Sequence, residues 1–166
     1  MKIHIFFIKS KESSSCPYCD GVLIVRDTKL RHVIRKESEE PCWYRLRRLK
    51  CKGCNKLHTE LPDLMQPFKH YESISIQDTL DDNRENCCKA EETTLYRWRS
   101  DWARAKATIE ALLIACWMNE TRKSYPLYHD SLLNIIQKSE SSWLAFVMRN
   151  LISAGHRIHT QFAFCP

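Results

Sequence analysis

Glycine is scarce in this chain, accounting for only three of its 166 residues. A loop that cradles a nucleotide phosphate through its backbone amides needs several glycines close together. Gly21, Gly53 and Gly155 stand far apart in the sequence. The sequence therefore excludes phosphate-loop nucleotide chemistry as the function.

Long apolar runs are also missing. The first apolar run ends at Lys9, whereas a signal peptide needs an apolar core of ~7–15 residues followed by a small-residue cleavage site. No stretch approaches the ~20 apolar residues that a membrane span requires. We therefore expect a cytoplasmic, nucleoid-associated protein that has no membrane partner.

Cysteine, by contrast, is abundant, with nine residues. Four of them form two pairs, each with two intervening residues. That spacing turns both thiolates of a pair toward one point, and two such pairs supply the four-sulfur tetrahedron that structural zinc prefers. The pattern predicts a zinc ribbon that holds one zinc ion per chain, bound by Cys16, Cys19, Cys51 and Cys54.

Other uses of these cysteines remain open as alternatives. A disulfide framework would suit a secreted chain, but the cysteine count is odd and reduced thiols are the rule in the cytosol. A redox-active pair would need a thioredoxin-like βαβ context. His58, on the strand expected after the second pair, is an alternative ligand in place of one cysteine. Cys87 and Cys88 form a further candidate metal or redox pair.

The pattern along the chain predicts an α+β fold in three parts. Residues 1–15 form a flexible lead, residues 16–70 a β-rich zinc ribbon, and residues 71–166 an all-helical domain. Inside the ribbon, the residues on either side of Asp27-Thr28-Lys29 favour two strands joined by a turn at that tripeptide. We also expect Trp43 to pack on the zinc site.

Positive charge concentrates in the ribbon. Residues 1–70 hold 15 of the 26 Lys and Arg residues but only 8 of the 20 Asp and Glu residues. Such asymmetry points to a polyanionic partner, although a solvated basic surface is the simpler alternative. The densest basic run leads into the second cysteine pair, and it supplies the candidate DNA phosphate contacts Arg45, Arg47, Arg48, Lys50 and Lys52.

Helical periodicity begins near Tyr71, where apolar residues start to recur in steps of three and four. We expect helices over residues 71–80, 84–91, 93–119, 127–138 and 142–154, with the third as one long helix or as two helices joined at a bend. The first three, within about 71–104, suggest a helix-turn-helix whose third helix recognises DNA. In that helix Leu95 and Trp98 would face inward, and the candidate DNA contacts are Thr94, Tyr96, Arg97 and Arg99.

Several of these segments together resemble a known family. The two cysteine pairs, the run Trp43–Cys54, the connector His58–Pro67 and the motif Thr94–Arg99 resemble an uncharacterised bacterial family, a domain of unknown function found mostly in Firmicutes. That family is itself similar to the zinc-ribbon and helix-turn-helix ends of insertion-sequence transposases. The resemblance covers residues 16 to about 104, and it implies DNA binding and a mobile-element origin without supplying a catalytic mechanism.

A catalytic domain is not expected. Transposases of the RNase H type hold two metal ions on three carboxylates of a mixed sheet, but the acidic residues after position 104 fall in helical segments. We therefore predict a non-enzymatic protein that binds double-stranded DNA and no small-molecule substrate, with a second copy or a transposase as a further partner. The alternative is an adaptor that binds a transposase or polymerase subunit through its ribbon and helical half.

Overall fold

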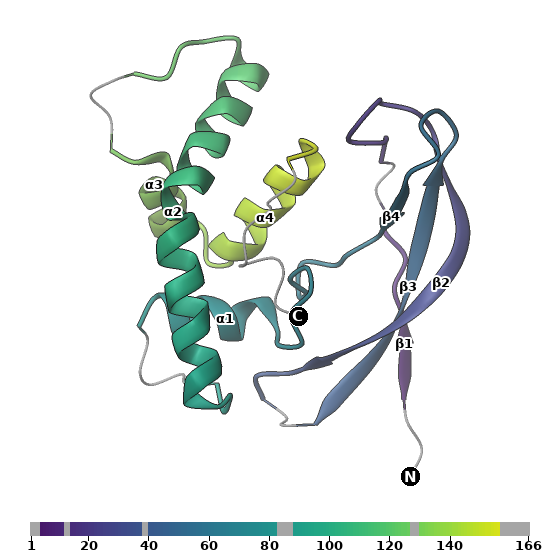
Figure 1. Ribbon diagram of the computed structural model, residues 1–166, viewed down its shortest axis with the longest axis horizontal. Helices are drawn as coiled ribbons and strands as arrows, with labels where there is room; N and C mark the ends of the chain where they lie inside the picture. Colours follow the sequence, from purple (N-terminus) through teal and green to yellow (C-terminus); the bar gives the residue numbers. More distant parts are fainter. Residues whose placement is uncertain (1–3, 12–13, 38–39, 83–87, 127–129, 157–166) are drawn as a thin grey trace.

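The computed structural model describes residues 4–11, 14–37, 40–82, 88–126 and 130–156. Its fold is α+β, with a four-stranded sheet in the N-terminal half and four helices after it, as the sequence predicts. The sheet and the helices stand side by side, and a connector of residues 60–72 runs between them (Figure 1). Within the described ranges, no helix is both long enough and apolar enough to cross a membrane.

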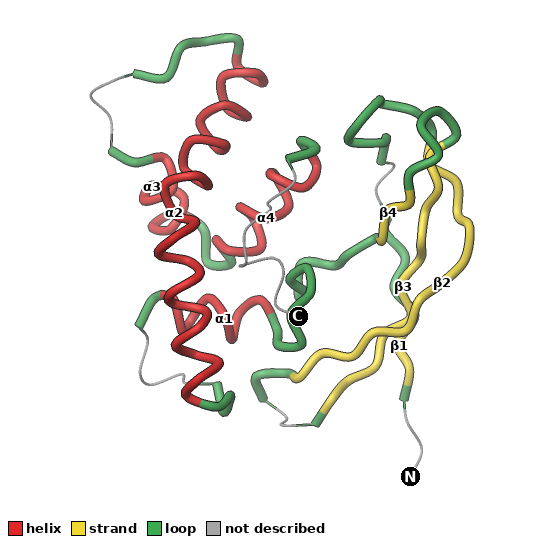
Figure 2. The backbone as a smooth tube through the Cα atoms, viewed as in Figure 1, coloured by secondary structure: helices red, strands yellow, loops and turns green. Residues whose placement is uncertain are grey.

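The sheet is built around its longest central strand. Strand β3 (Pro41–Cys51) pairs along one edge with the antiparallel strand β2 (Leu23–Ile34). Its other edge is shared by two short strands, the parallel β1 (Ile5–Phe7) near its start and the antiparallel β4 (Leu57–Thr59) near its end (Figure 2). This topology places the second cysteine pair at the far end of β3.

The predicted turn at residues 27–29 is wrong, because β2 continues through it as one strand. A register shift between Val25 and Asp27 absorbs the irregularity, and Asp27 then lies opposite Arg48. Both guanidinium nitrogens that face Asp27 donate to its carboxylate, at 2.5 and 2.6 Å. This bidentate pair satisfies an acidic residue that is otherwise unfavourable in a strand.

The helical half contains α1 (Ser73–Leu80), α2 (Glu92–Thr121), α3 (Leu132–Ser139) and α4 (Trp143–Ser153). The long helix predicted from residue 93 is confirmed as the unbroken α2. Half of the predicted short helix at 84–91 lies outside the described residues, and the described half, residues 88–91, contains no helix and ends at Glu91, the N-cap of α2. A helix-turn-helix is therefore not shown.

Two separate hydrophobic cores support the two halves. The helical core is large and is centred on buried tryptophans and aliphatic residues of α2, α3 and α4. Among the described residues, the buried members of the ribbon core are Val33, Tyr44, Leu46 and Met65. So small a core supplies little folding free energy by itself, and small domains of this kind usually need a metal or a disulfide.

Polar contacts fix the ribbon against the helices. Arg31 on β2 donates to the backbone carbonyls of Gln66 and Lys69 in the connector, and Lys36 forms an ion pair of 2.6 Å with Asp78 of α1. At the end of α4, Gly155 has a φ of 76°, and a Cβ atom there would lie 2.3 Å from the carbonyl oxygen of Pro17. Only glycine suits this position, where α4 meets the first cysteine pair.

Candidate metal centre and basic surface

Four sulfur atoms converge at the end of β3. The Sγ atoms of Cys16, Cys19, Cys51 and Cys54 all lie within 4.8 Å of one another. Two of the separations are 3.6 Å (Cys16 to Cys54) and 3.5 Å (Cys19 to Cys51). A tetrahedral zinc ion with Zn–S bonds of about 2.3 Å separates its sulfurs by about 3.8 Å. The cluster thus fits one metal ion.

These sulfurs are not joined by disulfide bonds. The four clustered cysteines are free thiols, and the separations above far exceed a covalent S–S bond of about 2.05 Å. The disulfide framework considered as an alternative is therefore not seen in this part of the chain. Cys87 and Cys165 lie outside the described residues.

The two cysteine pairs have the same backbone geometry. In each pair, the amide of the first cysteine donates to the carbonyl five residues later, at 3.0 Å in both cases. The residue after the second cysteine, Asp20 or Asn55, donates back to the carbonyl of the first cysteine and has a left-handed φ of 53° or 59°. Asp and Asn tolerate this conformation better than most residues do. The local sequence thus turns both loops toward a shared point.

Backbone amides near the cluster shift the pKa values of two of its cysteines. The amides of Gly53 and Cys54 approach the Cys51 sulfur at 3.3 and 3.5 Å, and the Cys54 amide is the largest cause that lowers the pKa of Cys51 to about 6. For Cys19, the Gly21 amide acts to lower the pKa, but hydrogen bonds with the Cys51 and Cys54 thiols raise it to about 11. A bound cation would displace the remaining protons, because metals bind thiolates.

His58 lies next to the cluster. Its Nε2 atom is 3.4 Å from the Cys16 sulfur, and burial, followed by the charge of Lys56, lowers the pKa of the ring. The Tyr18 ring lies 5.8 Å from the His58 ring and carries the Lys56 ammonium 3.5 Å from its centroid. Since four cysteines already converge, His58 acts here as a neighbour of Cys16, and its use as a replacement ligand stays a hypothesis.

Two of the three glycines pack directly against the sulfurs, which gives a prediction. A Cβ atom on Gly21 would lie 2.9 Å from the Cys51 sulfur and 3.2 Å from the Cys19 sulfur, whereas one on Gly53 would lie 3.3 Å from the Cys19 sulfur. Gly21→Ala should therefore lower zinc affinity more than Gly53→Ala, as overpacking costs about 1–3 kcal/mol. Competition with a chromophoric chelator measures both affinities, and an equal loss would contradict the close fit at Gly21.

Two of the residues predicted to contact DNA phosphates form ion pairs within the sheet. Arg47 binds the Glu60 carboxylate at 2.6 and 2.5 Å, and Arg48 binds Asp27 as described above. These guanidinium groups also lower the pKa of Glu60 and the pKa of Asp27, mainly through their hydrogen bonds. Because the acidic partners are 13 and 21 residues away in the sequence, the basic run by itself did not reveal them.

The other three basic residues of β3 and its extension face solvent to different degrees. Arg45 and Lys52 are exposed and Lys50 is half-buried. No ion pair involving their side chains is found among the described residues. These three residues are thus the better candidates for contact with an external anion.

The predicted contacts on α2 also divide into two groups. Tyr96 is 72 % exposed and Arg97 is exposed, while Thr94 is half-buried. Arg99 donates to the backbone oxygen of Thr79 at 3.2 Å and lies 3.5 Å from the Asp82 carboxylate, so it ties α2 to the end of α1. α2 begins near the tip of the β2–β3 hairpin, whereas β3 ends at the opposite end of the sheet (Figure 1).

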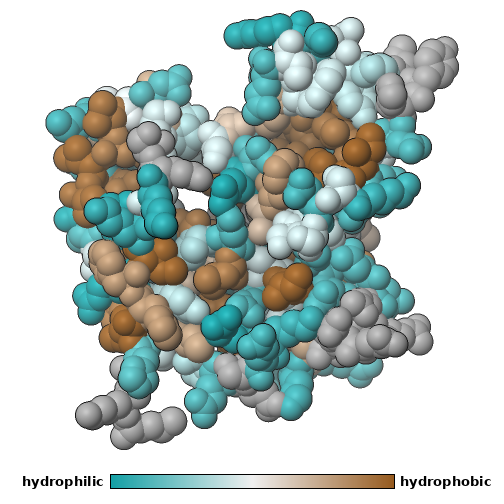
Figure 3. Space-filling model, turned by 180° about the vertical axis from the view of Figure 1, so that it is seen from behind, coloured by the Kyte–Doolittle hydropathy of each residue, from teal (hydrophilic) through white to brown (hydrophobic). Residues whose placement is uncertain are grey.

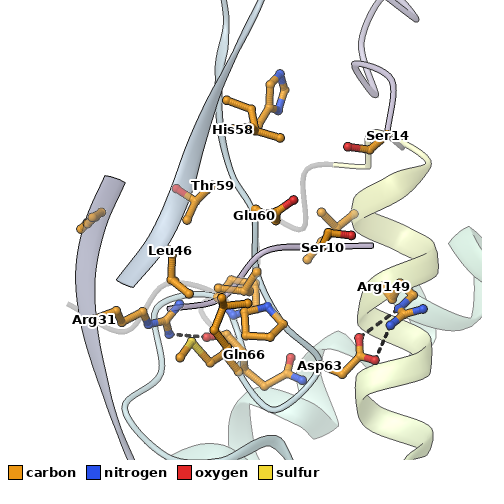
Figure 4. Close-up of a pocket in the computed structure, with 18 of the residues that line it drawn as sticks. Ser10, Ser14, Arg31, Leu46, His58, Thr59, Glu60, Asp63, Gln66 and Arg149 are labelled. Carbon is orange, nitrogen blue, oxygen red and sulfur yellow. Dashed lines mark hydrogen bonds and ion pairs between the residues drawn. The ribbon is translucent and has the colours of Figure 1, made fainter. Parts of the chain in front are cut away.

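One feature escaped the sequence-based prediction altogether. A groove of about 1430 Å³ separates the sheet from α4, and the connector forms its floor (Figure 4). Trp43 faces this groove, so the expectation that it packs on the zinc site is wrong. Its ring lies 5.0 Å from that of His32, which in turn stacks on His70 at 4.5 Å. No sequence spacing links these three residues.

Comparison with known proteins gives one match. A family model described as a domain of unknown function (DUF6431) matches residues 16–98, a range that includes all four clustered cysteines and the first turns of α2. Comparisons with curated proteins and with solved structures each returned no match.

Proposed function

The chain belongs to the DUF6431 family, whose function is unknown, and we propose that it is a DNA-binding protein that zinc folds and that has no catalytic centre of its own. One observation carries the proposal. The strand that ends at Cys51, together with the turn after it that carries Cys54, also presents basic side chains that have no acidic partner among the described residues. The metal would hold that strand in place, and the strand would hold the DNA.

The donor set favours zinc in a structural role. Four thiolates around one point suit a tetrahedral, borderline-soft ion such as zinc. Catalytic zinc sites keep one position for water or substrate, whereas four cysteines leave none. The bound ion would therefore supply folding free energy to a ribbon whose own core is small, as argued above.

The basic residues extend in a row away from the metal. Arg45 and Lys52 are seven positions apart, which corresponds to at most roughly 23 Å at about 3.3 Å per residue, because Lys52 lies in the turn after β3. A row of this length can contact several successive phosphates of a duplex. Phosphate contacts fix position and supply affinity but carry no sequence information. We propose that the ribbon supplies this general affinity.

The salt dependence of duplex binding tests whether Arg45, Lys50 and Lys52 contact DNA phosphates. Replacing Arg45, Lys50 and Lys52 together with alanine should weaken duplex binding and reduce the slope of log K against log salt by about 0.9 per lost phosphate contact, or roughly 2.7 in all. Fluorescence anisotropy with a labelled duplex at several salt concentrations measures the slope.

A matched control is available on the same strand. Arg47→Ala removes the same charge, but its guanidinium is held by Glu60, so this variant should leave the salt slope nearly unchanged and instead lower stability. If the triple variant retains the parent slope, or if Arg47→Ala reduces it by a full contact, the proposed surface is wrong.

Sequence recognition would come from α2. Tyr96 and Arg97 are exposed in its first two turns, and arginine reads guanine through two hydrogen bonds in the major groove. We propose these two residues as the base contacts, with Thr94 beside them. Transposase ancestry and nucleoid association belong to the same proposal.

A second candidate function is a protein-interaction adaptor. Strand β1 exposes all its side chains, with Ile5, Phe6 and Phe7 exposed by 46, 53 and 59 %. Leu30 on β2, which lies across β3 from Phe7, is also exposed. Seen from behind, apolar side chains gather over the part of the surface formed by the sheet (Figure 3). An adaptor of this kind would show no salt-dependent duplex binding.

A further inference from the structure

The groove between the sheet and α4 carries a surplus of positive charge. Its lining includes Lys11, Lys29, Arg31 and Arg149, against only two acidic residues among the described lining. Both acidic residues are already paired, since Glu60 binds Arg47 and Asp63 binds Arg149 (Figure 4). The groove therefore favours an anionic occupant.

Aromatic rings form one part of the same groove. The rings of Trp43, His32 and His70 follow one another from β3 through β2 to the connector, with His32 and His70 nearly parallel at 18°. These three residues, which we call the aromatic ladder, all line the groove. His70 lies at the end of the ladder and is exposed. Burial, together with the charges of His32 and Arg31, lowers the pKa of His70 and so favours the neutral ring. A neutral aromatic ring is a suitable surface for stacking.

Hydrogen bonds fix the backbone at the His70 end of the ladder. The backbone oxygen of His70 accepts a hydrogen bond of 2.7 Å from the Ile34 amide. The two carbonyls that Arg31 binds flank the same turn of the connector. A preorganised surface loses little conformational entropy when a ligand stacks on it.

An unused acceptor lies at the floor of the groove. Gln66 is only 2 % exposed, and its amide nitrogen donates to Ser73 at 2.9 Å. Its Oε1 atom has no hydrogen-bond partner in the described part of the chain. A buried acceptor without a donor costs free energy, and the ring N–H of a thymine or uracil base is a donor that a small movement of the floor would admit.

We propose that this groove binds single-stranded nucleic acid, with an unpaired base stacked on His70 and the phosphates held by Lys29 and its basic neighbours. Grooves that combine positive charge with aromatic rings bind single strands in this way. The volume exceeds the ~300–1,000 Å³ of a small-molecule pocket. A duplex is disfavoured because its base faces are covered by their neighbours. This site is separate from the duplex surface proposed above.

Anisotropy with oligonucleotides of about 12 nucleotides, within the site sizes of known single-strand grooves, tests the proposal on the zinc-loaded full chain. Oligo(dT) and oligo(U) should both bind, and each should bind the parent protein more tightly than it binds His70→Ala by about fivefold or more, the equivalent of about 1 kcal/mol per stacked base. Their relative affinities identify DNA or RNA as the preferred strand.

Two controls make the result specific. His70→Phe retains a stacking ring and should keep the affinity, and Ile135→Ala on the exposed surface of α3 should change nothing. If His70→Ala binds the single strand as well as the parent does, or if it loses duplex affinity to the same degree, the proposal is overturned. Self-association that His70→Ala abolishes would also overturn it, since a second copy would then occupy the groove.

The duplex proposal is tested separately by the triple variant of the basic row. Loss of single-strand binding in His70→Ala together with an unchanged duplex salt slope in the triple variant would support the single-strand site in the groove. The same result would refute the proposal that Arg45, Lys50 and Lys52 contact duplex DNA. Unchanged single-strand binding in His70→Ala together with a reduced duplex salt slope in the triple variant would refute the single-strand site and support the duplex contacts.

Discussion

Replacing Cys51 with serine is expected to release the metal and to unfold the ribbon. Cys51 is fully buried and ends β3, and its loss leaves three ligands around the site. Binding of structural zinc to small domains contributes about 10–16 kcal/mol of apparent free energy coupled to folding. Because the ribbon core has only four buried members among the described residues, it cannot replace a contribution of that size. Zinc content and amide exchange of β2 and β3 measure the result.

Cys116→Ser is the matched control. Cys116 is also buried, but it belongs to the helical core on α2, far along the chain from the cluster. This variant should retain the zinc and the protected amides of the sheet, with at most a modest loss of helical stability. A Cys51→Ser protein that keeps both its zinc and the exchange protection of β3 would show that the cluster does not hold the ribbon together.

The second large effect is expected in the helical half. Trp98 is 2 % exposed and packs edge-on against the Tyr71 ring at 5.1 Å, so it joins α2 to the segment that precedes α1. Trp98→Ala should lower the free energy of unfolding by about 3–5 kcal/mol, through lost burial and the cavity that remains. Denaturant titration followed by circular dichroism at the helical signal measures it.

Tyr96→Ala provides the comparison, because it removes a large ring only two residues away. Tyr96 is exposed, so its removal should change the stability by no more than about 0.5 kcal/mol. Equal destabilisation by the two variants would mean that the orientation of α2 differs from the one described. If Tyr96→Ala instead weakens DNA binding at unchanged stability, it supports the proposed base contact.

The metal cluster was predictable because its information is local. Each pair of cysteines is separated by two residues, and each loop closes on itself through its own backbone hydrogen bonds. Only the meeting of the two loops is long-range, and the ligand preference of zinc makes that meeting a reasonable inference. The long helix α2 was predictable for a similar reason, since its apolar periodicity is sustained over many turns.

Features that depend on distant partners could not be predicted in the same way. The basic run carries no sign of its acidic partners in the sequence, because Glu60 and Asp27 approach Arg47 and Arg48 only in the folded sheet. Asp27 is also typical of a turn, and only the fold places Arg48 opposite it. The ladder of Trp43, His32 and His70 depends on the register of β2 with β3 and on the path of the connector.

Native mass spectrometry of the purified, untreated protein tests the central claim most directly. We predict one zinc ion per chain, seen as a mass increase of one Zn²⁺ less the two protons that the dication replaces at a given charge state, with all four cysteines bound as thiolates. Unfolding in a volatile denaturant with a chelator should return the mass of the metal-free chain with reduced cysteines. A native chain that carries no metal, while its sheet remains folded, would contradict the account.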